Sequence, residues 1–163
     1  MTRIFTAQPS HLPQNRVVIL RSMYNEHVTS KLLEGALATL KARGIQDDKI
    51  DVLEVPGAYE LTAAAAHCAS AIDVDCVIAL GAVIRGETPH FDFICQSVAQ
   101  GLAQVAESSL IPVTFGVITS NTVEQAFERA GGRAGNKGEE AAKAALDLYS
   151  VLKQWEQHIA SGS

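Results

Sequence analysis

Residues 81–90 hold the densest group of side chains and backbone groups that could do chemistry, and they read Gly-Ala-Val-Ile-Arg-Gly-Glu-Thr-Pro-His. Their spacing imitates the phosphate-binding P-loop, but Glu87 stands where that motif needs a lysine, which disfavours a nucleoside triphosphatase. Thr88 followed by Pro89 is typical of a helix start, with the threonine as N-cap. Free N–H groups at Gly86, Glu87 and Thr88 would suit a small anion such as a phosphate monoester, although a plain capping turn accounts equally well for these residues.

His90 follows directly, in the first turn of the expected helix. The positive end of the helix dipole penalises an imidazolium there and favours a neutral imidazole, which can accept a proton near neutral pH. The competing interpretation is a polar first-turn residue with no part in catalysis. His90 is therefore the candidate proton carrier of this chain.

Four further residues are candidates of less specific character. The Tyr24 ring could stack on a planar heterocycle, although a loop aromatic is more often simply packed. Glu60 could bind a substrate hydroxyl, but the helix dipole alone would favour a carboxylate at a helix start. Arg129 and Lys137 flank the glycine-rich residues 131–136, and within one chain both are interpreted as solvated charges.

Composition and charge exclude several classes of partner. The formal net charge is -5 with no long basic run, which argues against nucleic acid. No apolar run approaches the roughly 18 residues of a membrane span, and residues 1–15 lack the apolar centre of a signal peptide. Cys68, Cys76 and Cys95 form no Cys-x-x-Cys pair, and no histidine spacing is typical of zinc. We expect a reduced, cytoplasmic protein without a metal site.

Apolar runs and helical periodicity alternate along the chain. Strands are expected at residues 16–20, 50–55, 76–80 and 113–118, and helices at 26–43, 59–70, 91–109, 122–130 and from about 137 onward. Nearly uniform apolar strands, each followed by an amphipathic helix, predict a three-layer α/β fold with a four-stranded parallel sheet. Residues 1–15 are expected to be a flexible arm unless a neighbouring chain orders them, 16–158 a single domain and 159–163 a tail. Ligands of such sheets bind at the carboxyl ends of the strands, where the candidate residues gather.

Several strings of the sequence resemble the lumazine synthase family, which is also known as the riboflavin synthase beta-chain family. The longest is Gly-Ala-Val-Ile-Arg-Gly-Glu-Thr-Pro-His-Phe-Asp at residues 81–92. Val-Pro-Gly-Ala-Tyr-Glu precedes it at 55–60, and Phe-Gly-Val, Glu-Gln-Ala, Glu-Arg-Ala-Gly and Gly-Asn-Lys-Gly follow between residues 115 and 138. The resemblance extends from about residue 16 to residue 157.

This resemblance implies a flavodoxin-like fold, whose sheet an N-terminal strand of a neighbouring subunit can extend. It also implies a homopentamer with active sites at the subunit interfaces. Some members stack twelve pentamers into a hollow icosahedral shell, and some associate with riboflavin synthase. The implied reaction joins 5-amino-6-(D-ribitylamino)uracil to 3,4-dihydroxy-2-butanone 4-phosphate with release of phosphate and water. It is a transferase reaction that needs neither cofactor nor metal.

Motif by motif, the resemblance also implies roles for individual residues. His90 takes the position of the proton carrier, and Tyr24 the position of the ring that stacks on the pyrimidine. The ribityl chain would be lined by Ala58, Tyr59 and Glu60, and the pyrimidine edge would meet the backbone of Ala82, Val83 and Ile84. The phosphate would be held by Gly86, Glu87, Thr88 and Arg129. The far side of the pocket, across a subunit boundary, would be formed by Phe115, Arg129 and Lys137. The family usually has Phe or Trp at the position of Tyr24.

Two other functions fit parts of this pattern. A phospho-receiver domain shares the alternation of strands and helices, but it needs a cluster of acids at the strand ends to hold magnesium. Here Arg21 and Ser22 follow the first strand and Gly81 follows the third. A shell-forming or flavin-binding relative that has lost activity is the second alternative. It would have no need of the complete set Glu60, His90, Arg129 and Lys137.

Overall fold

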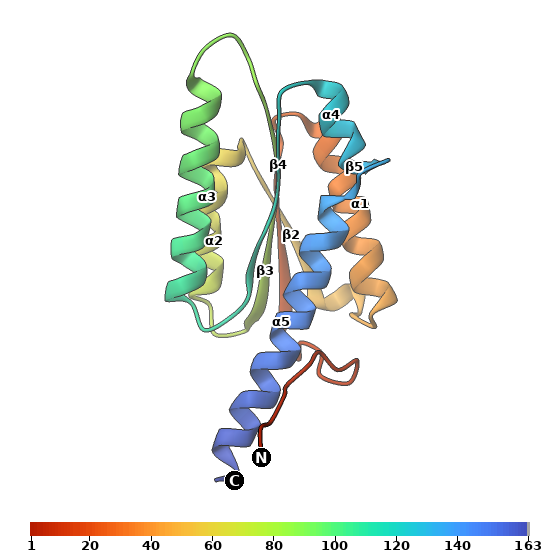
Figure 1. The fold of residues 1–163 in the computed structure, drawn as a ribbon, viewed down its shortest axis with the longest axis vertical. Coiled ribbons are helices and arrows are strands. Elements are labelled where there is room, and N and C mark those ends of the chain that lie inside the picture. Colours follow the sequence, from red (N-terminus) through yellow and green to blue (C-terminus); the bar gives the residue numbers. More distant parts are fainter. Residues whose placement is uncertain (163) are drawn as a thin grey trace.

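The computed structural model describes residues 1–162, and it consists of a central parallel sheet between two layers of helices (Figure 1). The strands of the sheet are β1 (Arg16–Ser22), β2 (Ile50–Val55), β3 (Val74–Ile84) and β4 (Val113–Ser120). The helices are α1 (Glu26–Ala42), α2 (Leu61–Ala69), α3 (His90–Ser108), α4 (Val123–Glu128) and α5 (Lys137–Ala160). Two short 3-10 turns, η1 (Asp47–Lys49) and η2 (Ala58–Glu60), and a hairpin of β5 (Ala130–Gly132) and β6 (Gly135–Asn136) complete the fold.

The strand order β2-β1-β3-β4, all parallel, confirms the predicted flavodoxin-like three-layer fold. Helices α2 and α3 cover one face, and α1, α4 and α5 lie on the other (Figure 1). Strand β1 shows why its apolar run is continuous. Val17 and Ile19 belong to the core beneath α1 and α5, whereas Val18 and Leu20 belong to the core beneath α2 and α3. A strand buried on both faces has no polar side, as the sequence indicated.

The observed helices agree with the expected ranges to within two residues, but β3 is longer than the predicted 76–80. Its last residues continue to pair with β4, Ala82 with Ile118 and Ile84 with Ser120. Gly81 was interpreted as the start of a loop. It lies inside the strand, where a Cβ would approach the Leu61 and Ser22 side chains to 3.0 Å, so packing selects the glycine there.

The glycine-rich residues 131–136 form the β5–β6 hairpin, where only a helix break was predicted. Gly131 and Gly135 have φ of +109° and +82°, a region that glycine adopts without strain. Asn136 then caps α5, because its Oδ1 accepts hydrogen bonds from the N–H groups of Gly138 and Glu139. A Cβ at Gly138 would overlap the carbonyl oxygen of Leu32, so α5 begins in direct contact with α1.

Residues 1–15, expected to be a flexible arm, lie along α5 of their own chain in the structure, without helix or strand (Figure 1). Ser150 Oγ accepts a hydrogen bond from Gln8 N at 2.8 Å. The Asp75 carboxylate accepts two more, from the N–H groups of Gln14 and Asn15. Burial first, and then the charge of Asp75, raise the pKa of Tyr149 nearby to about 12. Among residues 1–162, no helix combines the length and apolar character of a membrane span.

Candidate active site

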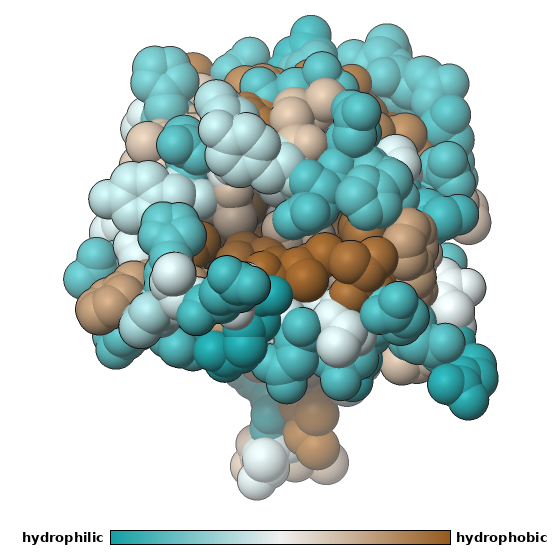
Figure 2. Space-filling view, turned by 90° about the horizontal axis from the view of Figure 1, so that it is seen from above, coloured by the Kyte–Doolittle hydropathy of each residue, from teal (hydrophilic) through white to brown (hydrophobic). Residues whose placement is uncertain are grey.

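A cavity of about 330 Å³ opens at the carboxyl ends of the strands, where the predicted ligand site lies. Figure 2 looks onto this end of the molecule and shows a hydrophobic strip between hydrophilic residues. The loops after β1 and β2 supply the lining, together with the end of β3 and the first turns of α3. The lining residues are Tyr24, Asn25, Gly57, Ala58, Tyr59, Glu60, Ala82, Val83, Ile84, His90 and Ile94. A larger cavity of about 710 Å³ lies at the opposite end of the sheet and contains none of the candidate residues.

Tyr24 presents a ring that is fixed on one side and open on the other. Its N–H donates to the Pro56 carbonyl oxygen at 2.9 Å, which ties the loop after β1 to the loop after β2. The ring lies against Gly57, because a Cβ added there would come within 2.6 Å of Tyr24 Cδ2. The side of the ring away from Gly57 is accessible, since the residue is 67% exposed. A planar heterocycle can stack on such a surface.

Substituting Gly57 by alanine should therefore weaken binding of a planar ligand by about tenfold, because the new methyl group displaces the Tyr24 ring. The backbone tolerates alanine, since φ at Gly57 is -134°. Fluorescence titration with a substituted pyrimidine, as a planar heterocycle, measures the effect. In a Tyr24→Ser background only the smaller cost of the contact with Glu60 Oε2, 3.2 Å from the new Cβ, should remain, and equal losses in both backgrounds would contradict this explanation.

Asn25 lines the cavity but was not predicted. Its φ is +60°, a left-handed conformation that asparagine tolerates better than most residues. Its Nδ2 donates to the Ala82 carbonyl oxygen at 3.0 Å, which fastens the loop after β1 to β3. An asparagine in the short loop after a buried strand was the available signal. Asn25 thus sets the distance between the Tyr24 ring and the backbone at 82–84.

Glu60 and His90 place a carboxylate and an imidazole on the same cavity. Glu60 Oε2 accepts a hydrogen bond from Gly57 N at 3.0 Å, whereas Oε1 has no partner within residues 1–162 and remains available to a hydroxyl. His90 is the first residue of α3, and its N–H lies 3.4 Å from Thr88 Oγ1. Thr88 was predicted to be the N-cap, but that position belongs to Pro89 and α3 has no side-chain cap, so the prediction was wrong. Thr88 Oγ1 accepts only a long and weak hydrogen bond from His90 N.

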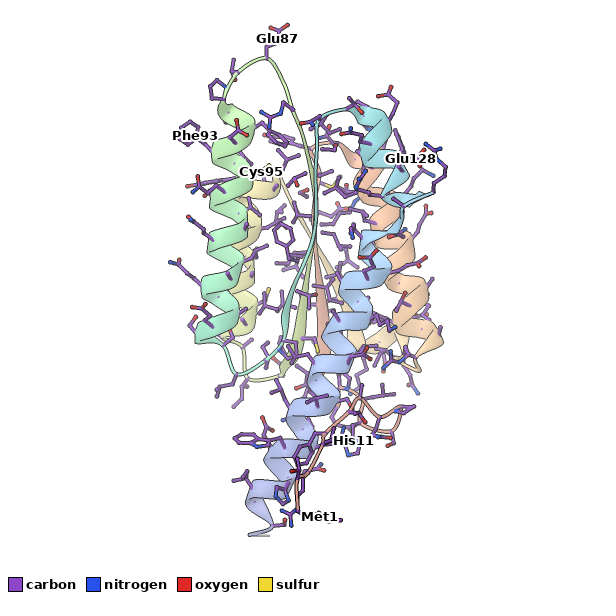
Figure 3. The ribbon with its side chains drawn as sticks, viewed as in Figure 1. Met1, His11, Glu87, Phe93, Cys95 and Glu128 are labelled. Carbon is purple, nitrogen blue, oxygen red and sulfur yellow. The ribbon has the colours of Figure 1, made fainter. Side chains whose placement is uncertain are left out.

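The candidate phosphate loop rises beside the cavity without lining it. Gly86, Glu87 and Thr88 are exposed, and within residues 1–162 their N–H groups have no hydrogen-bond partner. Figure 3 shows the Glu87 side chain at the tip of this loop, pointing away from the fold. The arrangement leaves a set of free donors next to His90, which an anion could occupy.

Three predicted residues lie away from the cavity within one chain. Phe115 belongs to β4, the open edge of the sheet, and is 44% exposed. Arg129 follows α4, and Lys137 begins α5, where its Nζ contacts Glu140 Oε2 at 2.7 Å. In Figure 3 Glu128, the neighbour of Arg129, lies on the side of the sheet opposite to α3. One chain thus brings together eight predicted residues, Tyr24, Ala58, Tyr59, Glu60, Ala82, Val83, Ile84 and His90, and leaves Gly86, Glu87, Thr88, Phe115, Arg129 and Lys137 outside the cavity.

A comparison with known families gives one match whose range includes both groups of residues. The profile described as 6,7-dimethyl-8-ribityllumazine synthase matches residues 14–153. The match includes all four strands of the sheet, every residue that lines the cavity, the β5–β6 hairpin and most of α5. Because the match covers far more than half of the 163 residues, the chain belongs to the 6,7-dimethyl-8-ribityllumazine synthase family.

Proposed function

We propose that the chain is an active 6,7-dimethyl-8-ribityllumazine synthase, a transferase that joins 5-amino-6-(D-ribitylamino)uracil to 3,4-dihydroxy-2-butanone 4-phosphate. The observation that carries the proposal is the cavity itself, which combines an open aromatic ring, a carboxylate and an imidazole within the family match. The Tyr24 ring would stack on the pyrimidine, with its hydroxyl left in solvent, and Glu60 would bind hydroxyls of the ribityl chain. The backbone of Ala82, Val83 and Ile84 would meet the edge of the heterocycle.

The chemistry needs acid and base catalysis but no redox step. The free amine of the pyrimidine attacks the ketone carbon, and a carbon–nitrogen bond forms with loss of one water. Phosphate then leaves with the electrons of its carbon–oxygen bond while a proton is lost from the adjacent carbon. The second nitrogen attacks the newly formed ketone, and a second water departs. His90 would carry protons in these steps, next to the free N–H groups that bind the phosphate.

Positioning should supply much of the rate, because both substrates are already reactive. His90→Ala should therefore slow the enzyme only about tenfold, below the range of roughly 10²–10⁴ that general acid–base catalysis commonly contributes. Product absorbance and fluorescence on mixing both substrates measure the rate. His67→Ala, an exposed histidine on α2, is the matched control and should be unchanged. A wild type no faster than the uncatalysed mixture would eliminate the synthase and leave the inactive shell or flavin-binding relative.

We further propose that the site is completed by a second subunit of a pentamer. Phe115 on the open edge of β4, together with Arg129 and Lys137, would face the cavity of a neighbouring copy. The other open edge, β2, is where an N-terminal strand of a neighbour would extend the sheet. Sedimentation velocity distinguishes a pentamer from a shell of twelve pentamers. Repeated after riboflavin synthase is added, it would also detect association of the two proteins. A cytoplasmic location fits the free cysteines Cys68, Cys76 and Cys95.

A further inference from the structure

The loop between β3 and α3 carries the candidate phosphate donors but has few contacts of its own. Residues 86–89 are exposed, and no atom beyond residues 85–87 lies within 4 Å of the place where a Cβ of Gly86 would be. The hydrogen bond between His90 N and Thr88 Oγ1, at 3.4 Å, is too long to hold the loop firmly. A loop that must present several N–H groups to one anion therefore needs support from residues at its ends.

Arg85 supplies that support from the first position of the loop. Its N–H donates to the Ser120 carbonyl oxygen at 2.9 Å, and its Nε donates to Asn121 Oδ1 at 2.9 Å, so it is bound to the end of β4. Its two terminal nitrogens donate to the two oxygens of Asp92 at 3.2 and 3.0 Å. The guanidinium also lies 4.3 Å from the centre of the Phe91 ring. The Arg85 side chain thus joins the two ends of the loop formed by residues 86–90, here called the arch 86–90.

The ion pair of Arg85 and Asp92 also determines the net charge at the start of α3. Asp92 lies in the first turn of α3, where its carboxylate would repel an anion bound to the loop. Arg85 neutralises this carboxylate by a bidentate contact, the strongest geometry for such a pair. Three N–H donors of Arg85 are occupied by protein groups, and Arg85 does not line the cavity. Arg85 is therefore placed to hold the loop in position and is not placed to bind the phosphate directly.

We infer that Arg85 is a positioning residue for the sugar-phosphate half of the reaction. By bridging Asp92 and Asn121 it holds the arch 86–90 at the span that lets the loop donors and the His90 ring act on one substrate. This inference rests on the proposed function. It predicts an effect confined to the phosphate-bearing substrate, because the Tyr24 side of the cavity is held separately through Pro56 and Gly57.

The test compares Arg85→Ala and Arg85→Lys with Arg16→Ala, assayed in the full-length protein. Arg16 forms a similar pair, with Asp51 at 3.0 Å and comparable exposure, but at the opposite end of the sheet. Arg85→Ala should raise KM for the sugar phosphate and the inhibition constant of inorganic phosphate by about tenfold or more, with KM for the pyrimidine changed less than about twofold. Arg85→Lys keeps the positive charge but loses the bidentate contact with Asp92. It should therefore recover only part of the affinity for the sugar phosphate and for inorganic phosphate. Arg16→Ala should match wild type.

Other results would overturn the inference. Equal inhibition constants for inorganic phosphate in Arg85→Ala and Arg16→Ala would exclude a positioning role, and so would parallel losses for both substrates. If Arg85→Ala does not fold, Arg85→Lys and Asp92→Asn give the same comparison. If wild type makes no product, the proposed function fails, but titration of inorganic phosphate followed by ³¹P NMR still tests the loop. Equal phosphate affinity in wild type and Arg85→Lys would then reject the inference by itself.

Discussion

Replacing Arg129 by alanine is expected to lower kcat/KM for the sugar phosphate by about a hundredfold, with little change in KM for the pyrimidine. A guanidinium binds phosphate oxygens through paired, charge-assisted hydrogen bonds, and its removal leaves a dianion to the loop donors alone. In the structure Arg129 Nη1 contacts only the Gln125 carbonyl oxygen, at 3.2 Å. Arg129 forms no salt bridge within residues 1–162, and its charge contributes only weakly to lowering the pKa of Glu128, so its guanidinium can still bind a ligand.

The neighbouring Arg133 provides a matched control for this experiment. Arg133 is an exposed arginine four residues further on, but its Nε is paired with Glu128 Oε2 at 2.9 Å. This contact lowers the pKa of Glu128, as expected for a carboxylate engaged by a cation. Arg133→Ala should therefore leave both KM values near those of wild type. Steady-state kinetics with each substrate varied in turn decides the question, and equal losses in the two variants would refute a phosphate role for Arg129.

The sheet could be predicted from the sequence because burial on both faces leaves a local pattern. The uniform apolar character of residues 17–20 needs no knowledge of the partner strands. The extension of β3 could not be predicted, because Gly81 indicates a loop locally and is selected by contacts with Ser22 and Leu61, which are distant in sequence. The β5–β6 hairpin was missed for a related reason. Glycines predict a break, but the direction of the chain after the break is set by the contact of Gly138 with α1.

The same division applies to the cavity. Tyr24, Glu60 and His90 were found because their chemistry is visible in their residue types and because the strand ends had to converge. Gly57 and Asn25 were missed because their importance is geometric, one as the surface beneath the Tyr24 ring and the other as a fastener to Ala82. Arg129 and Lys137 were interpreted as solvated charges from residue type alone, and one folded chain leaves them outside the cavity.

Co-expression of Tyr24→Ala and Arg129→Ala subunits is expected to give an activity well above the average of the two variants assayed separately. Each site of a ring would take its stacking ring from one subunit and its arginine from the next. When the two variants mix at random, about a quarter of the sites carry both wild-type residues. The two chains need different affinity tags, so that tandem purification isolates the mixed rings before the assay.

The control for this experiment is a mixture of two variants whose defects lie in the same cavity, so that mixing cannot restore a wild-type site. Tyr24→Ala and Glu60→Gln both alter the cavity of the same chain, so no site in a ring of these two subunits contains both wild-type residues. That mixture should show only the average of the two homogeneous enzymes. Recovery in the first mixture and none in the second would show that Arg129 acts on the cavity of a neighbouring subunit. If the first mixture also gives only the average, Arg129 must serve the cavity of its own chain, and the shared site is wrong.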